Sequence, residues 1–247
     1  LYTIGINTVY ASEKFGNEFT YFGTDLGAAY TEQSTTFRLW APTATEVAVN
    51  LYTTGSDAEE GAFDLGTYAM TEDINGTWIV TIEGDLEKIY YTYSVTRDGQ
   101  TVEAVDPYAR TTGVNGKRGM ILDLDTTDPT NWQNDKDPNP LVSYTDAIIY
   151  ELHVRDFSID ETSGVSPANR GKYLAFTETG TTTSNGTTTG IDYLDDLGVT
   201  HVHLLPVYDY ASVDETTSST FNWGYDPQNY NVPEGSYSTN PFDGAVR

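Results

Sequence analysis

The stretch AIIYELHV, residues Ala147–Val154, is nearly continuous in apolar side chains, which is typical of a strand buried on both faces of a parallel sheet. A second such run follows at Val199–Leu205, and a short helix is predicted between them at Ile191–Leu197. Apolar residues recur there at three-residue steps, and Gly198 can take the left-handed conformation that ends a helix. Strand, helix and strand in this order predict a right-handed βαβ unit, the repeating piece of a (β/α)8 barrel or of a doubly wound sheet.

A different pattern precedes this unit. From about residue 31 to residue 124, short alternating runs recur with turn residues between them, which is typical of an antiparallel β-sandwich. The dipeptides Asn75-Gly76 and Asp98-Gly99 supply the positive-φ positions that tight hairpins require. The strands predicted most clearly are Thr36–Trp40, Val47–Tyr52, Trp78–Ile82, Tyr90–Val95 and Thr101–Val105.

The change of pattern predicts a multi-domain chain. Residues 126–140 hold three prolines and several Asp and Asn, with almost nothing apolar, so we place a domain boundary there. The predicted parts are an N-terminal extension at 1–30, a β-sandwich module at 31–125, a linker at 126–145 and the start of a (β/α)8 TIM barrel at 146–247.

A complete barrel takes about 250 residues, and the last part supplies about two of its eight strands. Two parallel strands alone would leave their edges and apolar faces uncovered, which favours aggregation. We therefore expect the remaining C-terminal part of the barrel to pack against this chain, either as its continuation or as a separate chain.

Charge and composition restrict the partners. The chain has 12 Lys and Arg against 37 Asp and Glu, a formal charge of −25, which repels the phosphates of nucleic acid and anionic membrane surfaces. A neutral polysaccharide is indifferent to that charge. The absence of Cys excludes thiol catalysis and Cys-based zinc sites.

Aromatic residues gather in the segment that follows the second predicted strand. Rings can cover the apolar faces of sugars while Asn and Asp fix the hydroxyl groups, so this segment predicts a sugar-binding cleft at the C-terminal face of the strands. The alternative is a large loop that is packed by its own rings. The aromatic residues of 207–242 are Tyr208, Tyr210, Phe221, Trp223, Tyr225, Tyr230, Tyr237 and Phe242.

One motif in this segment resembles that of a known family. Residues 221–227, FNWGYDP, differ only at the first position from the YNWGYDP motif of type I pullulanases, within the α-amylase family of glycoside hydrolases. Residues 150–157 and 198–206 resemble the first two barrel strands of that family. Residues 37–44, FRLWAPTA, resemble the opening of the β-sandwich, related to starch-binding modules, that precedes the barrel.

The resemblance implies a bacterial, secreted or cell-surface debranching enzyme. Such an enzyme hydrolyses α-1,6-glucosidic linkages of pullulan, amylopectin or limit dextrin with retention. Tyr225 would stack against the glucose unit on the non-reducing side of the scissile bond, and Trp223 and Asp226 would shape the same wall, with Asn222 also in the substrate-binding set. The alternative for Trp223 and Asp226 is that they only lock the loop.

The family's catalytic carboxylates follow later barrel strands, so none is expected in this chain. We interpret Asp209, Asp214 and Glu234 as solvated surface acids. Related activities remain as alternatives, namely isoamylase, branching enzyme or a dual-specificity amylopullulanase. A non-catalytic α-glucan-binding protein is an alternative of a different class.

Metal sites are weakly indicated, and no cofactor is required for this chemistry. His201 and His203 share one face of a strand and could form a metal pair, but the resemblance favours packing in or around the barrel for these two and for His153. A run of acidic residues at 123–128 could offer oxygens to calcium, although it lacks the central glycine and terminal glutamate of an EF-hand loop. Its residues are Asp123, Asp125 and Asp128.

Overall fold

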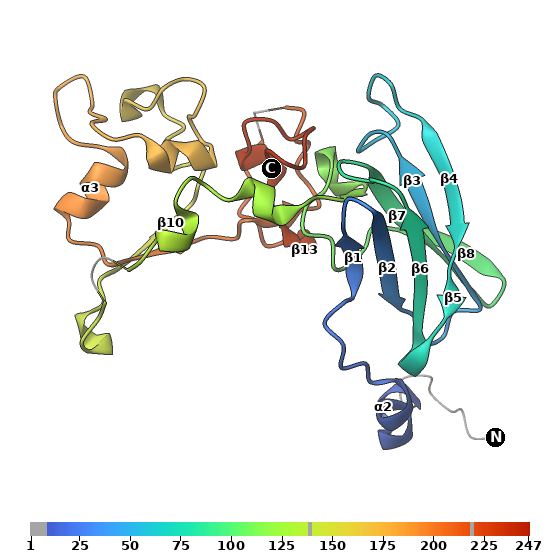
Figure 1. The fold of residues 1–247 in the computed structure, drawn as a ribbon. Coiled ribbons are helices and arrows are strands. Elements are labelled where there is room, and N and C mark those ends of the chain that lie inside the picture. Colours follow the sequence, from blue (N-terminus) through green and yellow to red (C-terminus); the bar gives the residue numbers. More distant parts are fainter. Residues whose placement is uncertain (1–8, 138–139, 218–219) are drawn as a thin grey trace, which may run out of the picture. The chain divides into compact units, whose positions relative to one another are not determined.

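The computed structural model describes residues 9–137, 140–217 and 220–247. Within them the chain forms two compact units (Figure 1). Unit 1 comprises the residues up to Arg110 together with Arg118–Asp123, and unit 2 comprises Thr111–Lys117 and Leu124–Arg247. Among the described residues no helix combines the length and apolar character needed to cross a membrane.

Unit 1 is an antiparallel β-sandwich. One sheet has the strand order β1-β2-β6-β5, and the other has the order β4-β3-β7-β8 with β9 paired to β7. A short helix, α2 (Glu13–Phe19), precedes them and begins at Ser12, whose hydroxyl caps the Phe15 amide. The strands are β1 (Gly27–Tyr30), β2 (Ser34–Trp40), β3 (Glu46–Tyr52), β4 (Asp64–Ala69), β5 (Thr71–Glu72), β6 (Thr77–Glu83), β7 (Tyr90–Arg97), β8 (Gln100–Ala104) and β9 (Gly119–Met120).

All five strands predicted for the sandwich are present, within three residues of the predicted ends. Both predicted hairpin turns are confirmed, since Asn75, Gly76, Asp98 and Gly99 all have positive φ. Side chains that alternate along four of these strands meet between the two sheets and form the core. Its buried members are Phe37, Leu39, Val47, Val49, Leu51, Met70, Trp78, Ile82, Tyr91, Tyr93 and Ile121.

Unit 2 contains the predicted strand, helix and strand. These are β10 (Ile149–Leu152), α3 (Gly190–Asp196) and β11 (His201–Leu204), and the two strands pair in parallel, with Ile149 opposite His201. Gly198 has φ +70° and ends the helix as predicted. An antiparallel hairpin, β12 (Tyr208–Tyr210) with β13 (Pro227–Pro233), follows and has irregular register.

Short 3-10 turns occupy much of the remaining chain. They are η1 (Ile74–Gly76), η2 (Val114–Gly116), η3 (Leu124–Thr127), η4 (Trp132–Asn134), η5 (Tyr144–Asp146), η6 (Glu161–Ser163), η7 (Tyr173–Thr177) and η8 (Gly235–Tyr237).

The expectation that both parallel strands are buried on both faces is wrong for this chain. Ile149 is 66% exposed, and Val202 and Leu204 are 40% and 37% exposed. The reason is that, in the described part of the chain, this sheet has only two strands, so its faces and outer edges lack the neighbours that would cover them.

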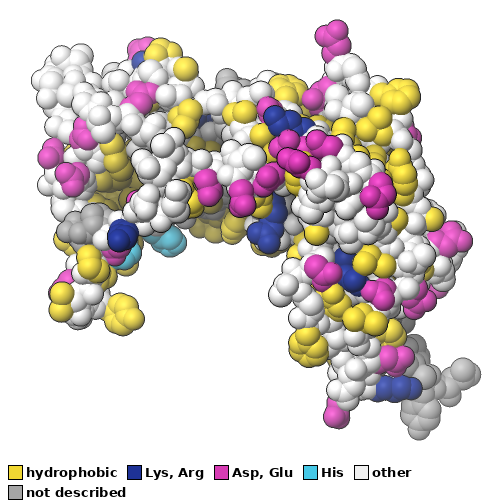
Figure 2. Space-filling model, viewed as in Figure 1, with side chains coloured by type: hydrophobic (Ala, Val, Ile, Leu, Met, Phe, Trp, Pro, Cys, Tyr) yellow, Lys and Arg dark blue, Asp and Glu magenta, His cyan; other side chains and the backbone are white. Residues whose placement is uncertain are grey.

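Acidic side chains predominate over basic ones on the surface shown in Figure 2, in line with the net charge of −25.

Candidate functional site

The aromatic segment, Phe221–Asp226, lies between β12 and β13 and has two kinds of position. Trp223 is 60% exposed and Tyr225 is 71% exposed. The residues that alternate with them, Asn222, Gly224 and Asp226, are partly or fully buried. The segment therefore offers two large rings to the solvent and holds itself to unit 2 through the positions between them.

The side chain of Asn222 is the centre of the hydrogen bonds within this segment. Its Oδ1 accepts the amide of Gly224 at 2.8 Å, and its Nδ2 donates to Asp226 Oδ1 at 2.9 Å and to Ser212 Oγ at 3.0 Å. One amide group thus fixes three other residues, and the backbone of the segment is determined by local contacts.

Gly224 occupies a position that no other residue fits. Its φ is +88°, in the left-handed region. A Cβ atom built there would lie 2.6 Å from the ring of Tyr210 and 2.8 Å from Cβ of Pro206. The backbone can therefore approach the buried Tyr210 only because this residue has no side chain.

Asp226 closes the segment at its far end. Its carboxylate accepts hydrogen bonds from the Ser212 hydroxyl and the Asn222 amide, and its carbonyl accepts the Ala211 amide at 2.9 Å. The Ser212 hydrogen bond is the main cause that holds the pKa of Asp226 below its ordinary value, and the Asn222 amide acts in the same direction. The Asp226 carboxylate is thus engaged within the loop, while its part in the sugar-binding wall stays a prediction.

Two of the three histidines lie away from this segment. His201 and His203 are exposed on β11, and Nδ1 of His203 lies 3.1 Å from Glu151 Oε2. His153 follows β10 and is buried, with its ring centroid 5.0 Å from that of Phe221. Phe221 in turn meets Trp223 edge to face at 5.5 Å, so the buried histidine adjoins the aromatic segment.

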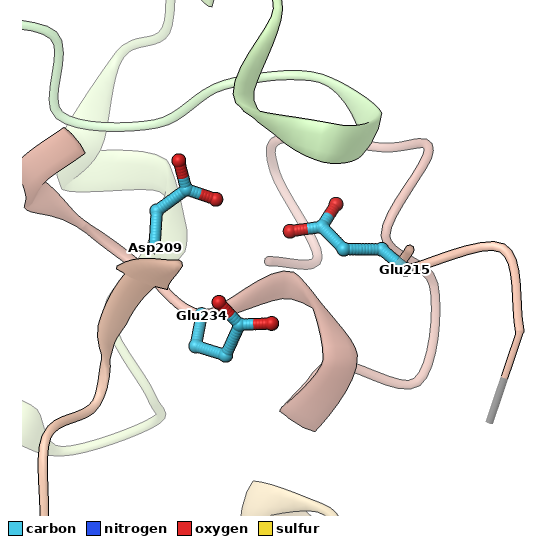
Figure 3. Close-up of side chains that lie close together, drawn as sticks. All are labelled: Asp209, Glu215 and Glu234. Atoms are coloured by element: carbon cyan, nitrogen blue, oxygen red, sulfur yellow. The ribbon is translucent and has the colours of Figure 1, made fainter. Parts of the chain in front are cut away.

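A buried cluster of carboxylates supports the hairpin that carries the segment (Figure 3). Oxygens of Asp209, Glu215 and Glu234 lie within 4.8 Å of one another. The interpretation of Asp209 and Glu234 as solvated acids is wrong, because both are fully buried; Asp214 is exposed as predicted.

One cation of the protein lies within this cluster. The guanidinium of Arg247, itself fully buried, donates to Asp209 and to both oxygens of Glu215. Burial raises the pKa of Asp209 to about 7, and Arg247 opposes that rise. Three convergent carboxylates could in principle hold a hard cation, but the cation in this structure is an arginine side chain.

Glu234 ties the cluster to the backbone. One oxygen accepts the Tyr210 amide at 2.8 Å and the other accepts the Ser236 amide at 2.9 Å. Burial raises its pKa above the ordinary value, while these hydrogen bonds act in the opposite direction. Together with Asp209, which accepts from Asn229, it joins both strands of the hairpin at the base of the aromatic segment.

A second aromatic surface lies in unit 1. A hollow of about 450 Å³ is bordered by Tyr21, Trp40 and Tyr108 among other residues. Nε1 of Trp40 donates to the carbonyl of Phe19 at 2.7 Å, which fixes the edge of the indole, and the side chain remains 42% exposed. The hollow is therefore bordered by rings that are partly open to solvent, with Tyr108 44% exposed.

The chain is similar to one domain family and to several pullulanases. Residues 25–109 match the family Carbohydrate-binding module 48 (Isoamylase N-terminal domain). The pullulanase of Bacillus subtilis (strain 168) is 42% identical over 98% of this chain and 32% of its own length. Pullulanase 1, chloroplastic, of Arabidopsis thaliana is 33% identical over 90% of this chain and 26% of its own length.

The fold of the chain is also similar to that of a pullulanase whose structure has been solved. The pullulanase of Paenibacillus barengoltzii, described as a complex with maltohexaose and α-cyclodextrin, superposes with a TM-score of 0.89 at 52% identity. The match covers 96% of this chain and 36% of that one. The chain therefore spans between 26% and 36% of the length of these three proteins.

Proposed function

Since this chain is similar to an amino-terminal portion of pullulanases along nearly its whole length, as its motifs predicted, we propose that the polypeptide that contains it is a debranching glycoside hydrolase. Its substrates are α-1,6-glucosidic linkages of pullulan, amylopectin or limit dextrin, and hydrolysis proceeds with retention through two carboxylates. In this proposal the carboxylates lie outside this chain, and β10, α3 and β11 begin the (β/α)8 barrel that holds them. We further propose that the protein is bacterial and is secreted or displayed on the cell surface.

The observation that carries the proposal is the pair of exposed rings on a hydrogen-bonded support. Trp223 and Tyr225 together present a large apolar surface, while Asn222 holds the backbone between them. A ring placed beneath a sugar excludes water and offers its electron-rich face to the positive charge that develops at the anomeric carbon. Tyr225 is the ring that we assign to this role, with Trp223 and Asp226 beside it.

Unit 1 adds a second contact with the same polymer. The match to Carbohydrate-binding module 48 supports binding of α-glucan there, and the hollow beside Trp40 and Tyr108 is the surface that we propose for it. Two linked sites on one polymer raise the effective affinity without any new contact.

The test is hydrolysis of pullulan by the complete polypeptide, followed by the same assay on a Tyr225→Ala variant. We expect maltotriose to be released and the variant to lose more than tenfold in turnover. The matched control is Tyr144→Ala, because Tyr144 is 94% exposed and lies outside the aromatic segment; it should retain normal turnover.

Two results would count against the proposal. Binding of α-glucan without any hydrolysis would leave a non-catalytic glucan-binding protein, and preference for amylopectin with no action on pullulan would favour an isoamylase. Normal turnover of Tyr225→Ala would remove the assigned role of that ring.

A further inference from the structure

The buried histidine beside the aromatic segment makes contacts that packing alone does not explain. His153 directly follows β10, and its side chain is 5% exposed. Its Nε2 lies 2.7 Å from the main-chain carbonyl oxygen of Asn222 and 3.0 Å from the hydroxyl of Tyr237. The residue at the end of a β-strand is thus joined to the centre of the segment that carries Trp223 and Tyr225.

The proton of this imidazole can be placed from its neighbours. A carbonyl oxygen can only accept, and the carbonyl oxygen of Asn222 lies 2.7 Å from Nε2 of His153. The hydroxyl of Tyr237, 3.0 Å from Nε2, accepts a hydrogen bond from the hydroxyl of Tyr210 at 2.7 Å, and its oxygen has a second lone pair. This lone pair can accept from Nε2 of His153.

Both partners of Nε2 are therefore acceptors. The carbonyl of Asn222 has no proton to give, so the hydrogen of this 2.7 Å contact belongs to the imidazole ring. Nε2 must carry the ring hydrogen, which leaves Nδ1 free to accept the amide of Asp156 at 3.4 Å. The ring is held at both nitrogens in one tautomer.

This arrangement fixes the aromatic segment from outside. The main chain of Asn222 is held by His153, and the side chain of Asn222 holds Gly224 and Asp226. Trp223 and Tyr225 are the residues between these held points. The positions of their rings therefore depend on Asn222, which His153 anchors to the end of β10.

We propose that His153 is a positioning residue, whose Nε2–H sets the aromatic segment in the conformation that binds α-glucan. The proposal rests on the proposed function, because the ligand of the segment is taken to be the glucan chain. When binding groups are already held in place before the ligand arrives, the entropic cost of ordering them on binding is avoided. Loss of the Nε2 donor should thus weaken glucan binding more than it weakens the fold.

The experiment compares two substitutions that fill the same space. His153→Gln places an amide N–H about as far from Cα as imidazole Nε2, whereas His153→Met has similar length and no donor. In the complete polypeptide we expect the Met variant to lose at least tenfold in kcat/KM on pullulan, mainly through KM. The Gln variant should remain within threefold of the wild type, and both should unfold near the wild-type temperature.

The matched control is His201→Gln. His201 lies at the amino-terminal end of β11, away from the face where barrel enzymes build their sites, and this variant should behave as the wild type. If Gln and Met lose activity equally, or if the loss follows the unfolding temperature, His153 is a packing residue and the proposal is overturned. His153→Asn, whose amide reaches only the Nδ1 position, should resemble Met and serves in its place if the Met variant does not fold.

A second readout separates this proposal from the proposed function. Quenching of tryptophan fluorescence by maltotriose, measured in a Trp40→Phe background so that the hollow of unit 1 does not contribute, reports binding near Trp223 without hydrolysis. If the wild type does not hydrolyse pullulan, the proposed function fails. Weaker quenching by maltotriose in the His153→Met variant than in the His153→Gln variant would still support the positioning role. Equal responses in the two variants overturn it.

Discussion

At the scale of single residues, the aromatic segment depends on a glycine. Gly224→Ala adds strain at φ +88° and also places a methyl group 2.6 Å from the Tyr210 ring. The strain alone costs more than about 1 kcal/mol, and the contact adds to it. We expect the variant to lower kcat/KM on pullulan at least tenfold and to lower the unfolding temperature.

The control for this variant isolates the steric part. Gly180 has φ +72°, and a Cβ atom there meets nothing within 4 Å. Gly180→Ala therefore carries the same kind of strain without the contact, and its effect on kcat/KM should be small. Equal losses in the two variants would show that close approach to Tyr210 is unimportant.

Some residues of the candidate site could be predicted from the sequence and others could not. The exposed rings of Trp223 and Tyr225 were predictable from their motif and surroundings. The anchor of His153 was not, because its partner is a main-chain carbonyl, and every residue carries one. The carboxylate cluster was missed because its members and Arg247 lie up to 38 residues apart in loops without periodic pattern, and exposed acids are the commoner case.

At the scale of elements, β7 is fastened to the chain beyond β8 by a buried acid. Asp106 accepts the hydroxyl of Tyr91 at 2.8 Å and the amide of Tyr108 at 2.8 Å. Burial is the main cause that raises the pKa of Asp106 above its ordinary value of 3.8. Folded Asp106 therefore keeps its proton at pH values where the unfolded chain has released it.

The direction of the pH effect follows from this difference. A raised folded pKa contributes stability that is complete below about pH 4 and is lost as the pH rises through the folded value. We expect the unfolding temperature of the wild type, relative to Asp106→Asn, to fall as the pH is raised from about 4 to 8. A constant difference across that range would contradict the pKa assignment.

Asp85 provides a control of opposite sign. The amide of Glu87 and the hydroxyl of Tyr30 lower its pKa. The stability that it contributes is present above its ordinary pKa and is lost as the pH falls through the lowered value. Relative to Asp85→Asn, the wild type should therefore lose stability below about pH 4.

The elements also differ in how well sequence predicted them. Strands β2, β3, β6 and β7 carry large apolar side chains on one face, and this alternation identified them. Strands β1 and β4 were missed because GAAY and DLGTYA have small or exposed side chains, and the pairing that makes them strands comes from their neighbours.

At the scale of the whole molecule, the exposed parallel strands predict the behaviour of the chain on its own. Ile149, Val202 and Leu204 expose apolar surface on a two-stranded sheet, and such surface favours association. The chain alone should bind a hydrophobic dye and scatter more light than the complete polypeptide at equal concentration. Equal signals would show that nothing further covers these strands.

A pair of substitutions locates the source of that signal. Val202→Thr in the isolated chain should reduce dye binding, because it makes the exposed face of β11 more polar. Val102→Thr changes a residue that is 63% exposed in unit 1 and should leave the dye signal unchanged.

The alternation along Phe221–Asp226 has a consequence for how such a protein can be altered. Asn222, Gly224 and Asp226 maintain the backbone, while Trp223 and Tyr225 face outward. The residues that determine the shape of the segment are therefore not the residues that determine its ligand preference. A library randomised at 223 and 225 alone should keep most members folded while it scans new carbohydrate specificities, whereas one randomised at 222, 224 and 226 should yield mostly lost function.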